Sequence, residues 1–164
     1  MLVVFNFKNQ MSIKQQLELL EKFNQPISKQ HQLIIAPIIP NYNDYHFDIA
    51  VQNLSIKGRN VGDLSPQHLK HYNINYAFVG HLERQKYLNE TTRMIRSKID
   101  NALQKDIIPI ICVGNHENPI FECATYLDDL DLQDKHIIVA YEILSATLKG
   151  KKDYSFIDVE ESFQ

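Results

Sequence analysis

Residues 76–84 read YAFVGHLER, a short apolar run that ends in glycine and is followed at once by polar and charged side chains. A continuous apolar run of this kind is typical of a parallel strand that is buried on both faces. Polar residues directly after such a strand lie at its carboxyl end, where parallel α/β folds gather their chemistry. The stretch therefore predicts a buried parallel strand that delivers His81 and Glu83 to a functional edge.

Other apolar runs along the chain have the same character. We predict further strands over residues 2–5, 33–36, 47–51, 107–113 and 137–140. Segments with helical features separate several of these runs, and strand–helix alternation indicates right-handed βαβ units in an α/β fold. Pattern alone does not choose between an open doubly wound sheet and a closed barrel.

The helix signals between these runs have local causes. Ser12 with Gln15 three residues later forms a capping-box signature, and Ser65-Pro66 is a cap followed by proline at the first helical position. Apolar residues at helical spacing mark one face of a helix within 91–105. Residues 120–130 are predicted to be helical with a weak pattern, and 155–164 resemble the first turns of a helix.

Composition excludes several classes of protein. The 164 residues carry a net charge of −3 and 44% hydrophobic residues, which is typical of one globular domain. The sequence has no cluster of basic residues that would predict nucleic-acid binding. No apolar run approaches the length of a membrane helix. The N-terminus lacks the features of a signal peptide, so we expect a cytoplasmic protein. Cys112 and Cys123 have no paired ligand at zinc spacing, so we expect neither a metal site nor a disulfide.

Three polar side chains follow different predicted strands and would meet at one rim. Lys8 follows the first strand, His81 the fourth and Glu142 the sixth. Each alone is typical of a solvated loop residue. Together, a carboxylate, an imidazole and an ammonium group could abstract a proton beside a carbonyl and stabilise the resulting negative charge. The residues alone do not decide whether the chain catalyses such a proton transfer.

The motifs at these strand ends resemble the triose-phosphate isomerase family. The match runs from Asn6 to Gly150 and rests on segments in the family's order. Their residues here are Asn6-Phe-Lys8, Ala50-Val-Gln-Asn53, Gly62-Asp-Leu-Ser-Pro66, Tyr76 to Arg84, Asn89-Glu90, Ile110-Ile-Cys-Val-Gly114 and Ala140-Tyr-Glu142.

The resemblance implies a fold, a reaction and roles for individual residues. The fold would be an α/β (β/α)8-type barrel, here incomplete with about six βα units in one domain over 1–164. The reaction would interconvert dihydroxyacetone phosphate and D-glyceraldehyde 3-phosphate in glycolysis and gluconeogenesis, without cofactor or metal. Glu142 would be the base and His81 a neutral electrophile, the roles that this family's chemistry implies. Lys8 and Asn6 would bind substrate, with Glu83 pairing Lys8.

The sequence departs from the family pattern in four places. Barrels of this type run to about 250 residues, so we expect no counterpart here for strands seven and eight and their phosphate-binding loops. The lid segment Ile143–Gly150 lacks the family's hinge proline, tryptophan and first glycine. The second helix is nearly absent between residues 38 and 51. Leu82 replaces a serine beside the histidine.

Without strands seven and eight, the first and sixth strands would be open edges, which raises the question of partners. We expect a homo-oligomer or a second chain that completes the barrel. In this family the loop after strand three makes a homodimer contact, and here that loop spans 54–63 with Val61 near its tip. The alternatives are an active isomerase, an inactive remnant acting as a binding or assembly module or without function, and another phosphate-handling enzyme on the same scaffold.

Overall fold

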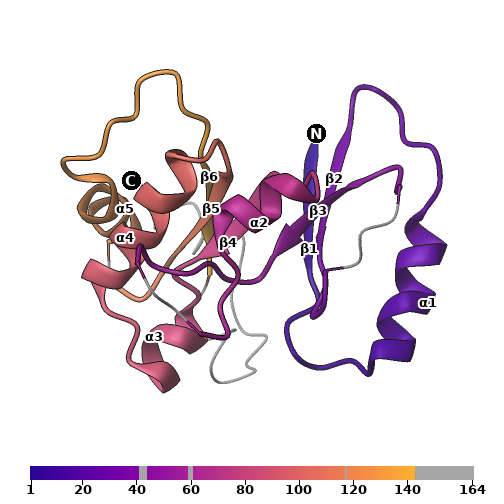
Figure 1. The fold of residues 1–164 in the computed structure, drawn as a ribbon, viewed down its shortest axis with the longest axis horizontal. Coiled ribbons are helices and arrows are strands. Elements are labelled where there is room, and N and C mark those ends of the chain that lie inside the picture. The colour runs from indigo at the N-terminus through magenta and orange to yellow at the C-terminus, as the bar shows by residue number, and fades with distance from the viewer. Residues whose placement is uncertain (41–43, 59–60, 117, 143–164) are drawn as a thin grey trace.

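A computed structural model describes residues 1–40, 44–58, 61–116 and 118–142, and its centre is one sheet of six parallel strands. The spatial order of the strands follows the sequence order from β1 to β6 (Figure 1). Their bounds are β1 Leu2–Asn6, β2 Gln32–Ala36, β3 Asp48–Val51, β4 Tyr76–Val79, β5 Ile108–Val113 and β6 Ile138–Tyr141. The predicted parallel α/β architecture is confirmed, and every predicted strand is present with small shifts at its ends.

Helices connect most of these strands, and the starts of α1 and α2 follow the predicted capping chemistry. Ser12 caps α1 with the reciprocal Gln15 bond of a capping box, and Ser65 with Pro66 begins α2. Thr91 and Asn118 accept N–H bonds at the starts of α4 and α5. The bounds are α1 Ile13–Phe23, α2 Pro66–His71, α3 Leu82–Leu88, α4 Thr92–Leu103 and α5 Pro119–Leu127.

Two segments differ from simple strand–helix alternation. The helix α3 follows β4 directly, although the sequence pattern did not predict it. Between β2 and β3, residues 37–40 and 44–47 contain no helix, in line with the expected shortening of this connection. The expected lid over 143–150 and the expected helix over 155–164 lie outside the described residues.

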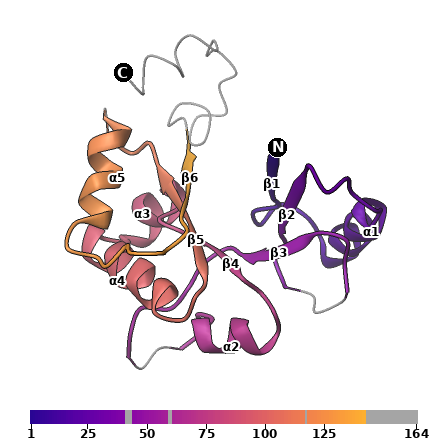
Figure 2. The same ribbon diagram turned by 90° about the horizontal axis from the view of Figure 1, so that it is seen from above.

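The sheet separates two apolar clusters because side chains alternate along each strand. One face carries the buried residues Ile34, Ala36, Ala50, Phe78, Ile110 and Cys112. The other face packs beneath the helices, where Ile35, Val79 and Ile111 share a cluster with Leu20 of α1 and Ile99 of α4. The result is a half-barrel with helices on its outer side (Figure 2). Its inner face carries the smaller apolar cluster, and the expectation of an incomplete (β/α)8-type barrel is confirmed.

Among the described residues, the first and last strands are the edges of this sheet. Leu2 and Phe5 of β1 are both 42% exposed, and Val139 of β6 is 44% exposed. In contrast, β2 to β5 each bury three or more consecutive residues. None of the helices in the described ranges is long and apolar enough to cross a membrane.

Candidate active site

Residues from β1, β4 and β6 meet at the carboxyl end of the sheet. Asn6 is the last residue of β1, and Lys8 lies two residues beyond it. His81 is the N-cap residue of α3, so it sits between the end of β4 and the first helical turn. Glu142 directly follows β6. Parallel strands bring these ends to one rim, which is why residues far apart in sequence lie together.

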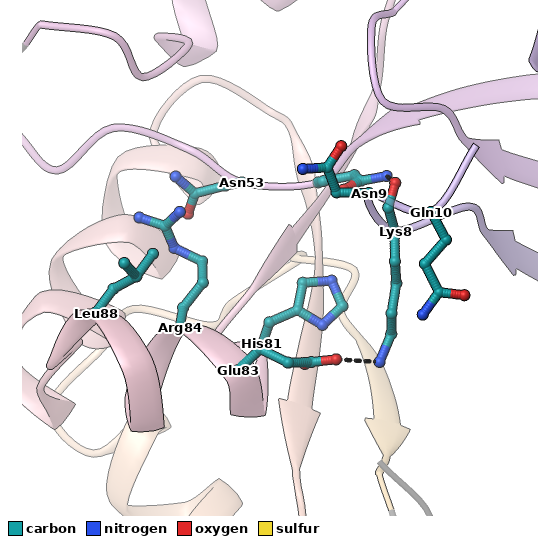
Figure 3. A pocket seen from close by; sticks show the side chains of 9 residues that line it. Lys8, Asn9, Gln10, Asn53, His81, Glu83, Arg84 and Leu88 are labelled. Carbon is teal, nitrogen blue, oxygen red and sulfur yellow. Dashed lines mark hydrogen bonds and ion pairs between the residues drawn. The ribbon is translucent and has the colours of Figure 1, made fainter. Parts of the chain in front are cut away.

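A pocket of about 470 Å³ opens beside this rim (Figure 3). Lys8 and Glu83 reach toward each other across it, with the His81 ring between their backbones. Glu142 is not among its lining residues but contacts His81 from the β6 side. The lining residues are Lys8, Asn9, Gln10, Gln52, Asn53, His81, Glu83, Arg84 and Leu88.

Hydrogen bonds around His81 define its neutral tautomer. The residue is only 7% exposed, and its ring stacks on Phe78 at 4.8 Å between centroids. Lys8 N–H donates to Asn6 Oδ1 at 2.8 Å, which leaves the Asn6 amide nitrogen facing His81 Nε2, also at 2.8 Å. Because that nitrogen is a donor, Nε2 accepts, and the ring proton of a neutral imidazole then resides on Nδ1.

The carboxylate of Glu142 is held from two sides. Its Oε1 lies 3.3 Å from His81 Nδ1, and its Oε2 accepts the Leu82 N–H at 3.1 Å. Lys8 Nζ lies 3.7 Å from Oε1. Burial alone would raise the pKa of Glu142, but the hydrogen bonds from His81 and Leu82 and the charge of Lys8 lower it below its usual value. Glu142 is therefore ionised at neutral pH.

Lys8 is the positive group of the site. It forms an ion pair with Glu83 on the first turn of α3, and its backbone takes a positive φ of 47°. Gln52 donates to the Lys8 carbonyl at 3.0 Å, which fixes the turn after β1. Burial alone would lower the pKa of Lys8, but the Glu83 hydrogen bond and the charges of Glu142 and Glu83 raise it. The ammonium form is thus favoured.

Three side chains of this site carry potential metal-ligand atoms. His81, Cys112 and Glu142 bring one such atom each to within 4.8 Å of one another. However, the Asn6 amide leaves the proton of neutral His81 on Nδ1, the atom that faces Cys112 and Glu142. Burial also raises the pKa of the Cys112 thiol well above its usual value, and Lys8 already supplies positive charge. Among the described residues, these three side chains thus surround the ring proton of neutral His81 and lie beside the Lys8 ammonium group.

A second, buried set of charges supports the pocket wall. Lys98 and Glu90 form an ion pair at 2.9 Å with both side chains 1% exposed. Glu90 also pairs with Arg84 at 2.6 Å, and Lys98 donates to Asn53 at 2.7 Å. Arg84 and Asn53 line the pocket, so this network connects the wall of the site to α4.

Comparisons with known proteins agree with this geometry. The sequence model of the triosephosphate isomerase family matches residues 1–152. A triosephosphate isomerase of Mesomycoplasma hyorhinis is 30% identical over 174 residues, covering 92% of this chain and 71% of the relative. The chain belongs to the triosephosphate isomerase family.

Other members of the triosephosphate isomerase family match shorter parts. The triosephosphate isomerase of Gloeobacter violaceus is 37% identical over 102 residues, which are 57% of this chain and 42% of the relative. That of Orientia tsutsugamushi is 35% identical over 125 residues, covering 67% of this chain and 48% of the relative. The chain thus spans between about two-fifths and seven-tenths of the lengths of these relatives.

Within this family member, the structure brings together the residues singled out from the sequence. Asn6, Lys8, His81, Glu83 and Glu142 form one chain of contacts. Sequence reasoning missed the supporting roles of Gln52, which follows β3, and of Cys112, whose sulfur lies 3.5 Å from His81 Nδ1. Gln52 was visible as a polar residue at a strand end, whereas Cys112 looked like an ordinary core thiol.

Proposed function

We propose that this chain carries the catalytic site of a triose-phosphate isomerase. The substrate pair would be dihydroxyacetone phosphate and D-glyceraldehyde 3-phosphate, and the protein would act in the cytoplasm in glycolysis and gluconeogenesis, without cofactor or metal. Residues 1–164 are taken as one domain of this kind. Glu142 is the base, His81 the electrophile, and Lys8 and Asn6 bind substrate, with Glu83 pairing Lys8.

The observation that carries this proposal is the position of Glu142 Oε1. It lies 3.3 Å from His81 Nδ1 and 3.7 Å from Lys8 Nζ. A carboxylate with a lowered pKa is ionised at neutral pH, which is the form that a base requires. The His81 donor and the Lys8 cation beside it could stabilise charge on a neighbouring oxygen. These groups match the needs of proton transfer beside a carbonyl.

The proposed steps use groups of this chain alone. Glu142 takes a proton from the carbon beside the substrate carbonyl, whose oxygen gains negative charge as the enediolate forms. The Nδ1–H of neutral His81, which faces Glu142 in the free protein, is the donor available to that oxygen. Lys8 lowers the energy of the anion by its charge. A proton then passes from the neighbouring hydroxyl oxygen to the former carbonyl oxygen, with His81 Nδ1 as the adjacent group that can relay it. Glu142 returns its proton to the adjacent carbon, and the former hydroxyl oxygen becomes the new carbonyl oxygen.

The two open edges support a proposal about partners. Phe5 on β1 and Val139 on β6 expose large apolar side chains at strands that supply Asn6 and lead to Glu142. Unpaired edges of this kind favour association. We propose that a second copy or another chain covers them, and Val61, fully exposed near the loop tip after β3, belongs to the same proposal of self-association.

The same edges favour a second candidate function, a binding or assembly module that lacks turnover. Under that alternative the charged site would be present but would not convert substrate. A steady-state assay decides between the two. The parent chain is assayed for conversion of glyceraldehyde 3-phosphate to dihydroxyacetone phosphate beside Glu142→Gln, with the exposed Glu18→Gln as a matched control. Activity in the parent and Glu18→Gln that is lost in Glu142→Gln supports the isomerase. Equal, background conversion in three folded samples supports the module.

A further inference from the structure

A buried carboxylate outside the proposed catalytic set lies beneath the turn that follows β5. Glu122, in the first turn of α5, is 2% exposed. Its Oε2 accepts the N–H of Gly114 at 2.7 Å, of Asn115 at 3.1 Å and of His116 at 3.4 Å. Three consecutive backbone N–H groups that converge on one oxygen form a tight anion cradle. Glu122 thereby fixes the conformation of the turn.

The turn that Glu122 holds touches the backbone of the proposed base. Gly114 has a φ of 129°, and a Cβ atom placed there would lie 2.0 Å from the carbonyl oxygen of Glu142. The preceding residue, Val113, accepts the Glu142 N–H at 2.7 Å. The peptide groups on both sides of the Glu142 Cα are therefore set by residues 113 and 114, and residue 114 is set by Glu122.

The other oxygen of Glu122, Oε1, begins a chain of contacts that ends at Gly80, the residue before His81, the proposed electrophile. The Tyr126 side chain is only 2% exposed. Its hydroxyl lies 2.7 Å from Glu122 Oε1 and 3.4 Å from Gln85 Oε1. Gln85 donates to the carbonyl of Gly80 at 2.8 Å, directly before His81. Burial and the Glu122 hydrogen bond raise the pKa of Tyr126, so its hydroxyl keeps its proton and remains a donor.

From these contacts we infer that Glu122 is a positioning residue for Glu142, acting through the Gly114 turn, with a second and weaker path through Tyr126 and Gln85 to His81. The inference rests on the proposed function for its catalytic meaning. Its structural content, that Glu122 holds the Glu142 backbone, stands independently. Glu122 does not reach the pocket, so it acts only through other residues.

Amide hydrogen exchange tests the positioning role whether or not the chain turns over substrate. Glu122→Ala removes the acceptor of the Gly114 turn. We expect the Glu142 N–H to exchange at least about tenfold faster, the factor that corresponds to losing a charge-assisted hydrogen bond. The amide of Ile35 in β2, distant from the turn, serves as the internal reference. Glu122→Gln keeps one acceptor oxygen and should restore most of the protection. An unchanged Glu142 exchange rate in a folded Glu122→Ala sample overturns the inference.

Kinetics then separates positioning from general loss of stability. In Glu122→Ala, kcat should fall by about ten- to a hundredfold, as for a misplaced catalytic group, with KM within about twofold. Ile99→Val, a core change on α4 away from the turn, is the stability control and should leave kcat unchanged. A Glu122→Ala enzyme with parental kcat overturns the catalytic part. A parent without activity refutes the proposed function instead, and the exchange result still decides whether Glu122 positions Glu142.

Discussion

The central and edge strands of the half-barrel differ in their burial and in the site residues that follow them. The strands β2 to β5 bury most of their side chains in two apolar clusters. In the part of the chain that the structure describes, β1 and β6 each have a neighbouring strand on one side only. His81 follows β4 in the buried centre, but Asn6 and Lys8 come from β1 and Glu142 follows β6. The proposed electrophile therefore follows a buried central strand, and the proposed base and cation follow the edge strands.

This difference shows what keeps the edges in register with the centre. Polar contacts to α3 tie each edge to the middle of the molecule: Lys8 pairs with Glu83, and Glu142 accepts the Leu82 N–H. Asn6 reaches His81 itself. The edge strands thus depend on the site for part of their order, just as the site depends on them. Removing a central contact should cost stability, and removing an edge contact should change the site first.

A buried and a partly exposed ion pair should differ most in their effect on the free energy of unfolding. Lys98 and Glu90 are buried at 1% exposure each, while Lys8 and Glu83 are about one-third exposed. Lys98→Met leaves Glu90 with only Arg84 as a charged partner, and we expect a loss of about 3 kcal/mol in the free energy of unfolding, the lower end for a broken buried pair. Urea denaturation measures it. Lys14→Met, at an exposed position of α1, is the control, and an equally small change in both variants would contradict the buried pair's importance.

Truncation of apolar side chains compares the strands directly. Ile111 on β5 is fully buried, and Ile111→Ala should lower the free energy of unfolding by about 2–5 kcal/mol through lost burial and a cavity. Val139→Ala on β6 should lower it by less than about 1 kcal/mol because that side chain is 44% exposed. Both values come from the same denaturation experiment. If Val139→Ala costs as much as Ile111→Ala in a monomeric sample, β6 is not an open edge.

The smallest expected effect on stability concerns Lys8 and the pH dependence of folding. Glu142 has a lowered pKa in the folded chain, so its contribution is present above the ordinary value of 4.5 and is lost as pH falls through the folded value. Lys8→Met removes a charge that lowers this pKa, so the pKa should rise and the loss of stability below pH 4.5 should become shallower. Carboxyl-carbon NMR titration of Glu142 measures the shift. A lower or unchanged pKa would show that Lys8 does not act on Glu142.

Much of the fold followed from the sequence because its causes are local. Continuous apolar runs predicted the parallel strands, and the Ser12 and Ser65 caps predicted two helix starts. The helix α3 was not predicted because it is seven residues long, its N-cap residue His81 makes no side-chain cap bond, and it buries only Leu82. Such a short helix offers too few turns for a periodic signal.

The candidate site was less accessible to sequence reasoning than the fold. Lys8, His81 and Glu142 could be placed on one rim from strand ends, but their roles came from family resemblance. Glu122 gave no signal, because its importance arises from the backbone N–H groups of a turn in a different element. Backbone donors are present at almost every residue, so no sequence pattern marks the ones that converge.

Proton transfer to and from substrate carbon tests the central claim most directly. The folded chain is incubated with dihydroxyacetone phosphate in deuterium oxide, and proton NMR follows loss of hydrogen from the carbon beside the carbonyl. We expect exchange in the parent and in the exposed Glu18→Gln control, and none above background in Glu142→Gln. Exchange at the parental rate in Glu142→Gln, or background exchange in the parent, would contradict the assignment of Glu142 as the base.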